Sequence, residues 1–268
     1  MENEKIYNIY KLPELEEILK KCEDDIYDRI NELKIKEGED EVNFLLHTIG
    51  KSFVSTREVM ALCLNGFPDG ALSISRNIYE QFIITYYIEA RIDSEDDCDL
   101  LKKYNEDYSY QRAKALKYEA MYITKNNKNE EKYRTIINEI KKRYGIHNMK
   151  DYWWAKKDGA NFNDLCEFVA NHNKDMEHLL RSMHLLYKRA CLALHASSMG
   201  NMIRLGSDNS GVDMGPWEKG QENSLFLTTA SLVYIIASTY AVLEIDVTEV
   251  KESLNDLIIY YNSLLIKA

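Results

Sequence analysis

The chain has 268 residues and carries 34 lysines and arginines against 44 aspartates and glutamates, a formal net charge of -10. This length can bury a substantial core without disulfides. The acidic balance works against loose, charge-driven attachment to DNA, to RNA or to an anionic membrane, although it leaves a specific RNA contact open. The cysteines form no CxxC pair and are odd in number, which favours buried, reduced thiols in a cytoplasmic protein over a disulfide framework or a zinc site: Cys22, Cys63, Cys98, Cys166 and Cys191.

Predicted helices follow one another along almost the whole chain, because prolines are few and strand patterns are nearly absent. The first runs from about 13 to 36, with apolar residues at three- and four-residue spacing and Pro13 near its start. The second ends at Asn65-Gly66, and the polar tract KNNKNEE after the fourth is expected to be a solvated loop. The remaining predicted helices cover about 41–65, 69–91, 96–123, 129–144, 161–171, 174–199, 222–244 and 247–266.

These elements predict an all-α fold, a single multi-helix bundle of about eight to nine helices. Because no internal repeat and no linker-like change of composition occurs, we expect one domain over residues 1–268. The glycine-rich segment 206–220 is the one place where a long loop is expected.

The longest uncharged run, Leu225 to Leu243, is nearly long enough to cross a membrane. Threonines and serines interrupt it, and Glu222, Glu244 and Asp246 flank it without a nearby arginine. A helix that is apolar on nearly all sides also fits the centre of a bundle. We therefore expect a core helix, no signal peptide and no membrane attachment, with a membrane-associated protein as the least favoured alternative.

The predicted helix 69–91 is apolar except for a polar stripe on one face: Ser73, Arg76, Asn77, Glu80 and Gln81. Arg76 precedes Glu80 by four residues, which is the poorer order for a helix-stabilising pair, so surface stabilisation is a weak reason for them. One hypothesis is a polar pocket in which Arg76 binds an anion and Glu80 orients it or acts as a base. The alternative is a solvated face or a structural ion pair with a neighbouring helix.

The predicted helix 174–199 carries a second polar face, with residues at three- and four-residue spacing: Arg181, His184, Lys188, Cys191, His195 and Ser198. Histidine is the usual general acid or base, and a neighbouring lysine would lower its pKa by charge repulsion. The alternative for each histidine is a core position with a hydrogen bond to a neighbouring helix.

Metal and nucleotide motifs find little support. A di-metal helical bundle needs two Glu-x-x-His elements and further carboxylates, whereas the chain offers Asp175-x-x-His178 once. No phosphate-binding glycine loop, dinucleotide turn or nucleophile elbow occurs. We expect neither a metal ion nor a cofactor.

Three stretches, ALSISRNIYEQFIITYYIEAR, YWWAKKDGANFNDLCEF and LYKRACLALHASSMG, together resemble a family of bacterial all-helical proteins catalogued as a domain of unknown function. The resemblance spans roughly residues 45–205, with the C-terminal helices 222–266 packed on that core. It implies an all-helical fold and a site at the residues that match the family's motifs: Arg76, Glu80, Trp153 or Trp154, Tyr187, His195, and Ser197 or Ser198.

A weaker similarity is to the HEPN superfamily of helical ribonucleases and nucleotide-binding proteins. Its signature is an arginine followed by a histidine four to six residues later. Arg189 and His195, with five residues between them, fit that spacing, although Ala190 replaces the polar residue that often follows the arginine. On a straight helix six positions turn a side chain by about 600°, so the two would lie about 120° apart. In this superfamily the motif works across a dimer, so the similarity implies a homodimer in which the partner subunit supplies the cation that Arg189 does not bring to His195 of its own chain.

The leading hypothesis is a HEPN-like, metal-independent endoribonuclease of a toxin or phage-defence kind, with RNA as substrate. His195 would be the general base, Arg189 or Arg76 would stabilise the phosphorane charge, and Glu80 would orient the arginine. The alternative is a non-catalytic helical module that binds a protein partner or a small anionic ligand, in which Arg76, Glu80 and His195 form a closed structural network. In both, the ligand-binding candidates are Lys188, His184, Ser198, Asn77 and Tyr187.

Overall fold

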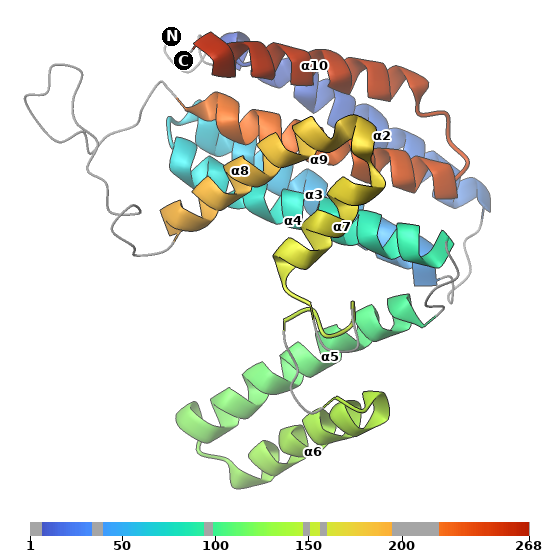
Figure 1. Cartoon of the computed structure of the whole chain (residues 1–268), viewed down its shortest axis with the longest axis vertical. Coiled ribbons are helices and arrows are strands. Elements are labelled where there is room, and N and C mark those ends of the chain that lie inside the picture. The colour runs from blue at the N-terminus through green and yellow to red at the C-terminus, as the bar shows by residue number, and fades with distance from the viewer. Residues whose placement is uncertain are drawn as a thin grey trace, which may run out of the picture. The chain divides into compact units, whose positions relative to one another are not determined.

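The computed structural model describes residues 7–33, 40–93, 99–146, 151–155, 160–194 and 220–267, and within them it confirms an all-α fold (Figure 1). An isolated antiparallel bridge joins Tyr152 and Ala160. The helices are α2 (Leu12–Leu33), α3 (Asp40–Leu64), α4 (Pro68–Asp93), α5 (Leu100–Tyr118), the π-helix η1 (Glu119–Ile123), α6 (Asn127–Tyr144), α7 (Phe162–His172), the 3-10 turn η2 (Lys174–Met176), α8 (Glu177–Leu194), α9 (Gln221–Val242) and α10 (Thr248–Lys267).

The helix bounds differ from prediction mainly around the tract KNNKNEE. This tract is largely helical rather than a loop, because α6 already begins at Asn127. The side chain of Asn126 accepts a hydrogen bond from the backbone N–H of Asn129 at 3.1 Å, which caps the first turn and lets the polar residues continue as helix. The preceding helix also ends differently, in the π-helical turn η1.

Two compact units share the chain. One comprises residues 1–85 and 173–268, and the other comprises residues 86–172, so that the boundary falls inside α4. The prediction of a single domain over residues 1–268 stays a prediction. The two units are described separately below.

In the first unit, α9 packs against α3, α8 and α10, and α10 lies along α2 (Figure 1). By length and composition α9 could cross a membrane, but 72% of its most apolar window is buried within the protein. Several of its hydroxyl groups find partners there: Ser231 donates to the carbonyl of Leu227 at 2.7 Å, and Thr228 donates to Ser75 of α4 at 2.9 Å. Burial on nearly all sides therefore accounts for the long uncharged run.

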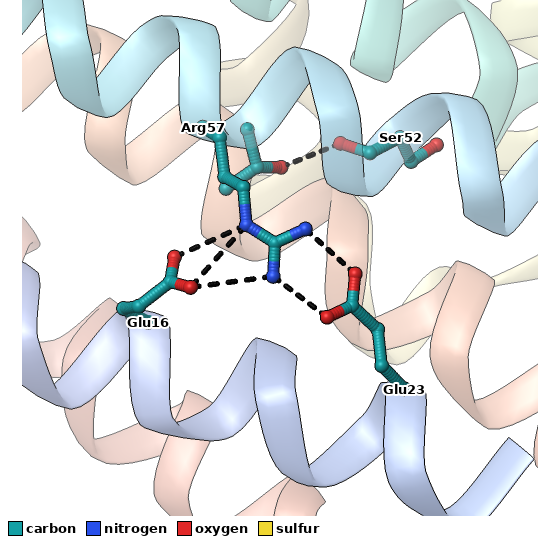
Figure 2. Close-up of polar contacts among 5 residues, drawn as sticks. Glu16, Glu23, Ser52 and Arg57 are labelled. Carbon is teal, nitrogen blue, oxygen red and sulfur yellow. Dashed lines mark hydrogen bonds and ion pairs between the residues drawn. The ribbon is translucent and has the colours of Figure 1, made fainter. Parts of the chain in front are cut away.

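Charged side chains hold α2 against its neighbours in the first unit. Figure 2 shows Arg57 of α3 between two glutamates of α2, donating to both oxygens of Glu23 at 2.6 and 2.8 Å and to Glu16 at 3.2 Å. Near the other end of α2, Arg29 donates from Nε to the carbonyl of Leu243 at 2.7 Å. These ties fix the position of α2 with planar, two-pronged hydrogen bonds.

In the second unit, α5 and α6 form an antiparallel hairpin joined through η1 (Figure 1). The two tryptophans of this unit, Trp153 and Trp154, are buried. The indole N–H of Trp153 donates to Asp107 at 2.6 Å, and Trp154 packs edge-on to Tyr104 with ring centroids 5.0 Å apart. The two tryptophans therefore belong to the core of this unit.

Candidate functional site

The Arg76–Glu80 pair predicted from the sequence exists and belongs to a wider cluster in the first unit. On successive turns of α4, Arg76 donates from Nε to Oε1 of Glu80 at 2.9 Å. Tyr187, from α8, donates its hydroxyl to the same Glu80 oxygen at 3.1 Å. The side chains of Arg76 and Glu80 are 26% and 22% exposed, so this ion pair lies at the edge of the core rather than free in solvent.

The guanidinium of Arg76 is held in one orientation. Its Cζ lies 5.5 Å from the ring centroid of Tyr187, which adds a cation–π contact to the hydrogen bond with Glu80. Burial alone lowers the pKa of Arg76, but the charge and hydrogen bond of Glu80 more than offset this and raise it above its ordinary value. Within the described residues, Nη1 and Nη2 of Arg76 make no hydrogen bond. Arg76 thus presents a fixed, charged edge with two donor atoms.

His184 packs in the same cluster. Its ring stacks on Tyr187 with centroids 5.6 Å apart, and its Nδ1 lies 3.5 Å from the hydroxyl of Tyr79. Burial, with a smaller contribution from the charge of Lys188, lowers the pKa of His184 below its ordinary value. His184 is therefore a neutral imidazole near pH 7.

Tyr187 connects the members of the cluster. Burial and the nearby charge of Glu80 raise the pKa of Tyr187 far above its ordinary value, so its hydroxyl is a hydrogen-bond donor at every physiological pH. The ammonium of Lys188 lies 5.9 Å from the centroid of the Tyr187 ring. One tyrosine therefore contacts both cations, the carboxylate and the imidazole.

Several predicted residues are thus brought together, and others are not. Arg76, Glu80, Tyr187, His184 and Lys188 form the cluster. Asn77 and Arg189 are exposed on α4 and α8, and no interaction of the described residues joins either to the cluster. His195 and Ser198 lie outside the described residues.

Sequence reasoning missed Tyr79, whose side chain is 1% exposed. Its ring centroid lies 5.4 Å from that of Tyr187, and it provides the polar neighbour of His184. Tyr79 lies on the apolar side of α4, where a tyrosine is normally a core residue. The apolar spacing therefore did not predict that Tyr79 belongs to the site.

Among the described residues, no three His, Cys, Asp or Glu side chains gather closely enough to hold a metal ion.

The helical core and this arginine–carboxylate–tyrosine cluster define an all-α protein with a half-buried, preoriented cation. The chain belongs to the family of unknown function DUF5677, whose model matches residues 42–212. The match confirms the predicted resemblance to a family of unknown function and contains every described member of the cluster, whereas α2, α9 and α10 fall outside it. The match does not bear out the HEPN similarity. No curated protein and no solved structure matches the chain.

Proposed function

We propose that this protein binds an RNA phosphate through Arg76 and cleaves RNA without a metal ion. The observation that carries the proposal is the fixed guanidinium of Arg76, whose Nε is engaged by Glu80 while Nη1 and Nη2 are unbonded within the described residues. Two parallel N–H donors match two phosphate oxygens, and a guanidinium already held in place loses little conformational entropy on binding.

The charges around Arg76 support an anionic ligand. Lys188 approaches the same Tyr187 ring from α8, and Glu80, which already accepts hydrogen bonds from Arg76 and Tyr187, is the carboxylate of the cluster. The neutral state of His184 adds no charge. A phosphodiester at the open edge of Arg76 would therefore meet a guanidinium at a partly desolvated site, where electrostatic attraction exceeds that in bulk water.

The proposed reaction is an internal transesterification. His195 takes the proton of a ribose 2'-hydroxyl, the 2'-oxygen bonds to the adjacent phosphorus, and the bond from phosphorus to the 5'-oxygen breaks. The leaving 5'-oxygen takes a proton from solvent, so the products are a 2',3'-cyclic phosphate and a 5'-hydroxyl. Arg76, or Arg189, balances the charge of the phosphorane, and Glu80 keeps Arg76 oriented. The role of His195 rests on the sequence similarity alone.

The test is cleavage of total cellular RNA and of a transfer RNA by purified protein in excess EDTA. We expect cleavage by the wild type and its loss in Arg76→Lys, Arg189→Ala and His195→Ala. Arg181→Ala is the matched control, since Arg181 is an exposed arginine of α8 that pairs with Glu177 at 2.8 Å. Absence of cleavage by a folded wild type, or equal cleavage by Arg76→Lys, would refute the proposal.

A toxin or phage-defence role and a homodimer belong to the same proposal. A second copy of the chain would bring another Arg189 to each His195, which one straight helix does not do. Light scattering is expected to report a dimer. Induced expression in a bacterial host is expected to arrest growth with the wild type and not with His195→Ala.

A second candidate function is a non-catalytic module for a small anionic ligand. The observation in its favour is that Tyr79, His184 and Tyr187 contact one another and that Tyr187 donates to Glu80, which resembles a structural network with one open edge at Arg76. This candidate predicts that phosphate or RNA binds without being cleaved and that Arg76→Lys weakens the binding.

A further inference from the structure

The hairpin of α5, η1 and α6 carries a charge opposite to that of the chain. Between Leu100 and Ile146 there are twelve lysines and arginines against six aspartates and glutamates, a net charge of +6, whereas the whole chain carries -10. The positive charge is thus concentrated on one pair of helices in the second unit. A local basic surface attracts polyanions even on an acidic protein, because solvent screens charges more than about 10 Å away.

The end of this hairpin exposes aromatic and apolar side chains. Tyr118, Tyr122 and Ile123 are between 58% and 71% exposed, and Met121 beside them is 42% exposed. They stand on the last residue of α5 and on the π-helix η1, a rare form of helix that is frequent at functional sites. The rings of Tyr118 and Tyr122 pack on each other with centroids 4.6 Å apart, so they present a preformed aromatic surface to solvent.

Cations border these rings. Lys117, Lys125 and Lys128 flank the turn, and none of them pairs with a carboxylate among the described residues. By contrast, Arg134 and Arg143, farther along α6, are engaged with Glu130 and Glu106. We define the tip surface by six of its exposed residues: Tyr118, Met121, Tyr122, Ile123, Lys125 and Lys128.

We propose that the tip surface binds single-stranded RNA. Unpaired bases stack on exposed tyrosine rings whatever their sequence, and lysines beside the rings attract the connecting phosphates. The choice of RNA among polyanions rests on the proposed function, but the surface itself is independent of Arg76 and lies in the other unit of the chain.

An anionic membrane is the main rival occupant, since Met121 and Ile123 are exposed beside lysines. Two aliphatic side chains bury little area in a lipid interface. Two packed tyrosine rings with free faces suit bases better. Tyr108, 68% exposed on α5 four residues before Arg112, extends the aromatic and basic character along the hairpin.

The test measures binding of a fluorescein-labelled oligouridylate of ~20 nucleotides, long enough for such a surface, to full-length His195→Ala protein in EDTA. We expect the double variant Tyr118→Ala/Tyr122→Ala to weaken affinity about tenfold or more. Lys125→Glu/Lys128→Glu is expected to weaken it and to flatten the slope of log affinity against log salt by about 1.4.

Matched controls lie in the other unit. Tyr27→Ala removes a tyrosine that is 68% exposed on α2, and Lys20→Glu/Lys251→Glu makes the same change of net charge with exposed lysines of α2 and α10. Both are expected to bind RNA as the His195→Ala parent does. Because every substituted side chain is exposed, thermal unfolding followed by circular dichroism should be unchanged.

Unaltered RNA binding by both tip variants would overturn the inference. So would loss of binding to phosphatidylserine-containing vesicles in the tip variants while RNA affinity stays the same, which would assign the surface to a membrane. Failure of the proposed function looks different: RNA then binds in a tip-dependent manner, and the wild type still does not cleave it.

Discussion

Replacing Tyr187 by phenylalanine tests the cluster with the least disturbance. The ring, which is 6% exposed and contacts Arg76, His184 and Tyr79, stays in place, and only the hydroxyl that donates to Glu80 at 3.1 Å is removed. A hydrogen bond to a charged group contributes about 1.5–3 kcal/mol. Glu80 keeps its bond to Arg76 and reaches solvent, so water replaces part of the loss, and we expect destabilisation of about 1–2 kcal/mol.

Urea unfolding followed by circular dichroism measures this change, which corresponds to a fall in Tm of about 2–6 °C for a protein of this size. The double variant with Glu80→Gln separates the pair, because two groups that interact directly show coupling of about 0.5 kcal/mol or more. RNA affinity should fall less than in Arg76→Lys, since Arg76 keeps its own carboxylate. A variant as stable as the wild type within ~0.3 kcal/mol would show that Tyr187 does not hold Glu80 in solution.

Three further predictions concern charge and burial. Lys188→Met should move the pKa of His184 back toward 6.5, seen by NMR titration of the ring protons, because the charge of Lys188 contributes to the lowered pKa. Because the pKa of His184 is lower in the native state, the unfolded chain binds a proton at this imidazole more readily. The free energy of unfolding contributed by His184 should therefore fall as the pH drops through and below about 6.5. A contribution that rises over this pH range would contradict the burial of His184. Arg57→Met should lower the free energy of unfolding by about 1–2 kcal/mol, measured by urea unfolding, because the arginine loses its two glutamate partners. Hydrogen bonding to Arg57 lowers the pKa of Glu23, so the difference in unfolding free energy between wild type and variant should shrink as pH falls below 4.5. A difference that does not change with pH would count against the Arg57–Glu23 pair. Burial raises the pKa values of the Cys63 and Cys22 thiols to about 12 and about 11, so both should resist dithionitrobenzoate at pH 8 in the native protein and react once it is unfolded, whereas rapid native reaction would contradict their burial.

Much of the fold follows from patterns visible in the sequence. Few prolines and a steady three- and four-residue apolar spacing predicted the helices, and the uncharged run after Leu225 predicted the core helix α9. The tract KNNKNEE was wrongly predicted as a loop, because its polar residues hid the asparagine cap that begins α6. Local capping geometry can override composition in this way.

The candidate site was predictable only in part. The i,i+4 spacing of Arg76 and Glu80 predicted their ion pair, and the family resemblance predicted that Tyr187 belongs to the site. The buried Tyr79 could not be told from a core tyrosine, since its partner His184 comes from a helix over 100 residues away. Which helices pack together is a tertiary property that spacing along one helix does not carry.

The basic hairpin was missed for a different reason. A net charge of -10 averaged over the chain argues against RNA, and it conceals the +6 between Leu100 and Ile146. Tyr118 and Tyr122 lie exposed where α5 passes into a π-helix, and nothing in the helical pattern sets them apart from core tyrosines. Helical spacing assumes a regular α-helix, so it misplaces side chains at such a turn.

The chemistry of the RNA ends distinguishes metal-independent transesterification by this protein from other cleavage and from binding alone. Transfer RNA incubated with the wild type in excess EDTA is treated with polynucleotide kinase and labelled ATP, with and without prior phosphatase. We expect fragments that accept label without phosphatase, because the proposed transesterification leaves 5'-hydroxyl ends, and we expect none with Arg76→Lys. Intact RNA, or fragments with 5'-phosphate ends, would contradict it.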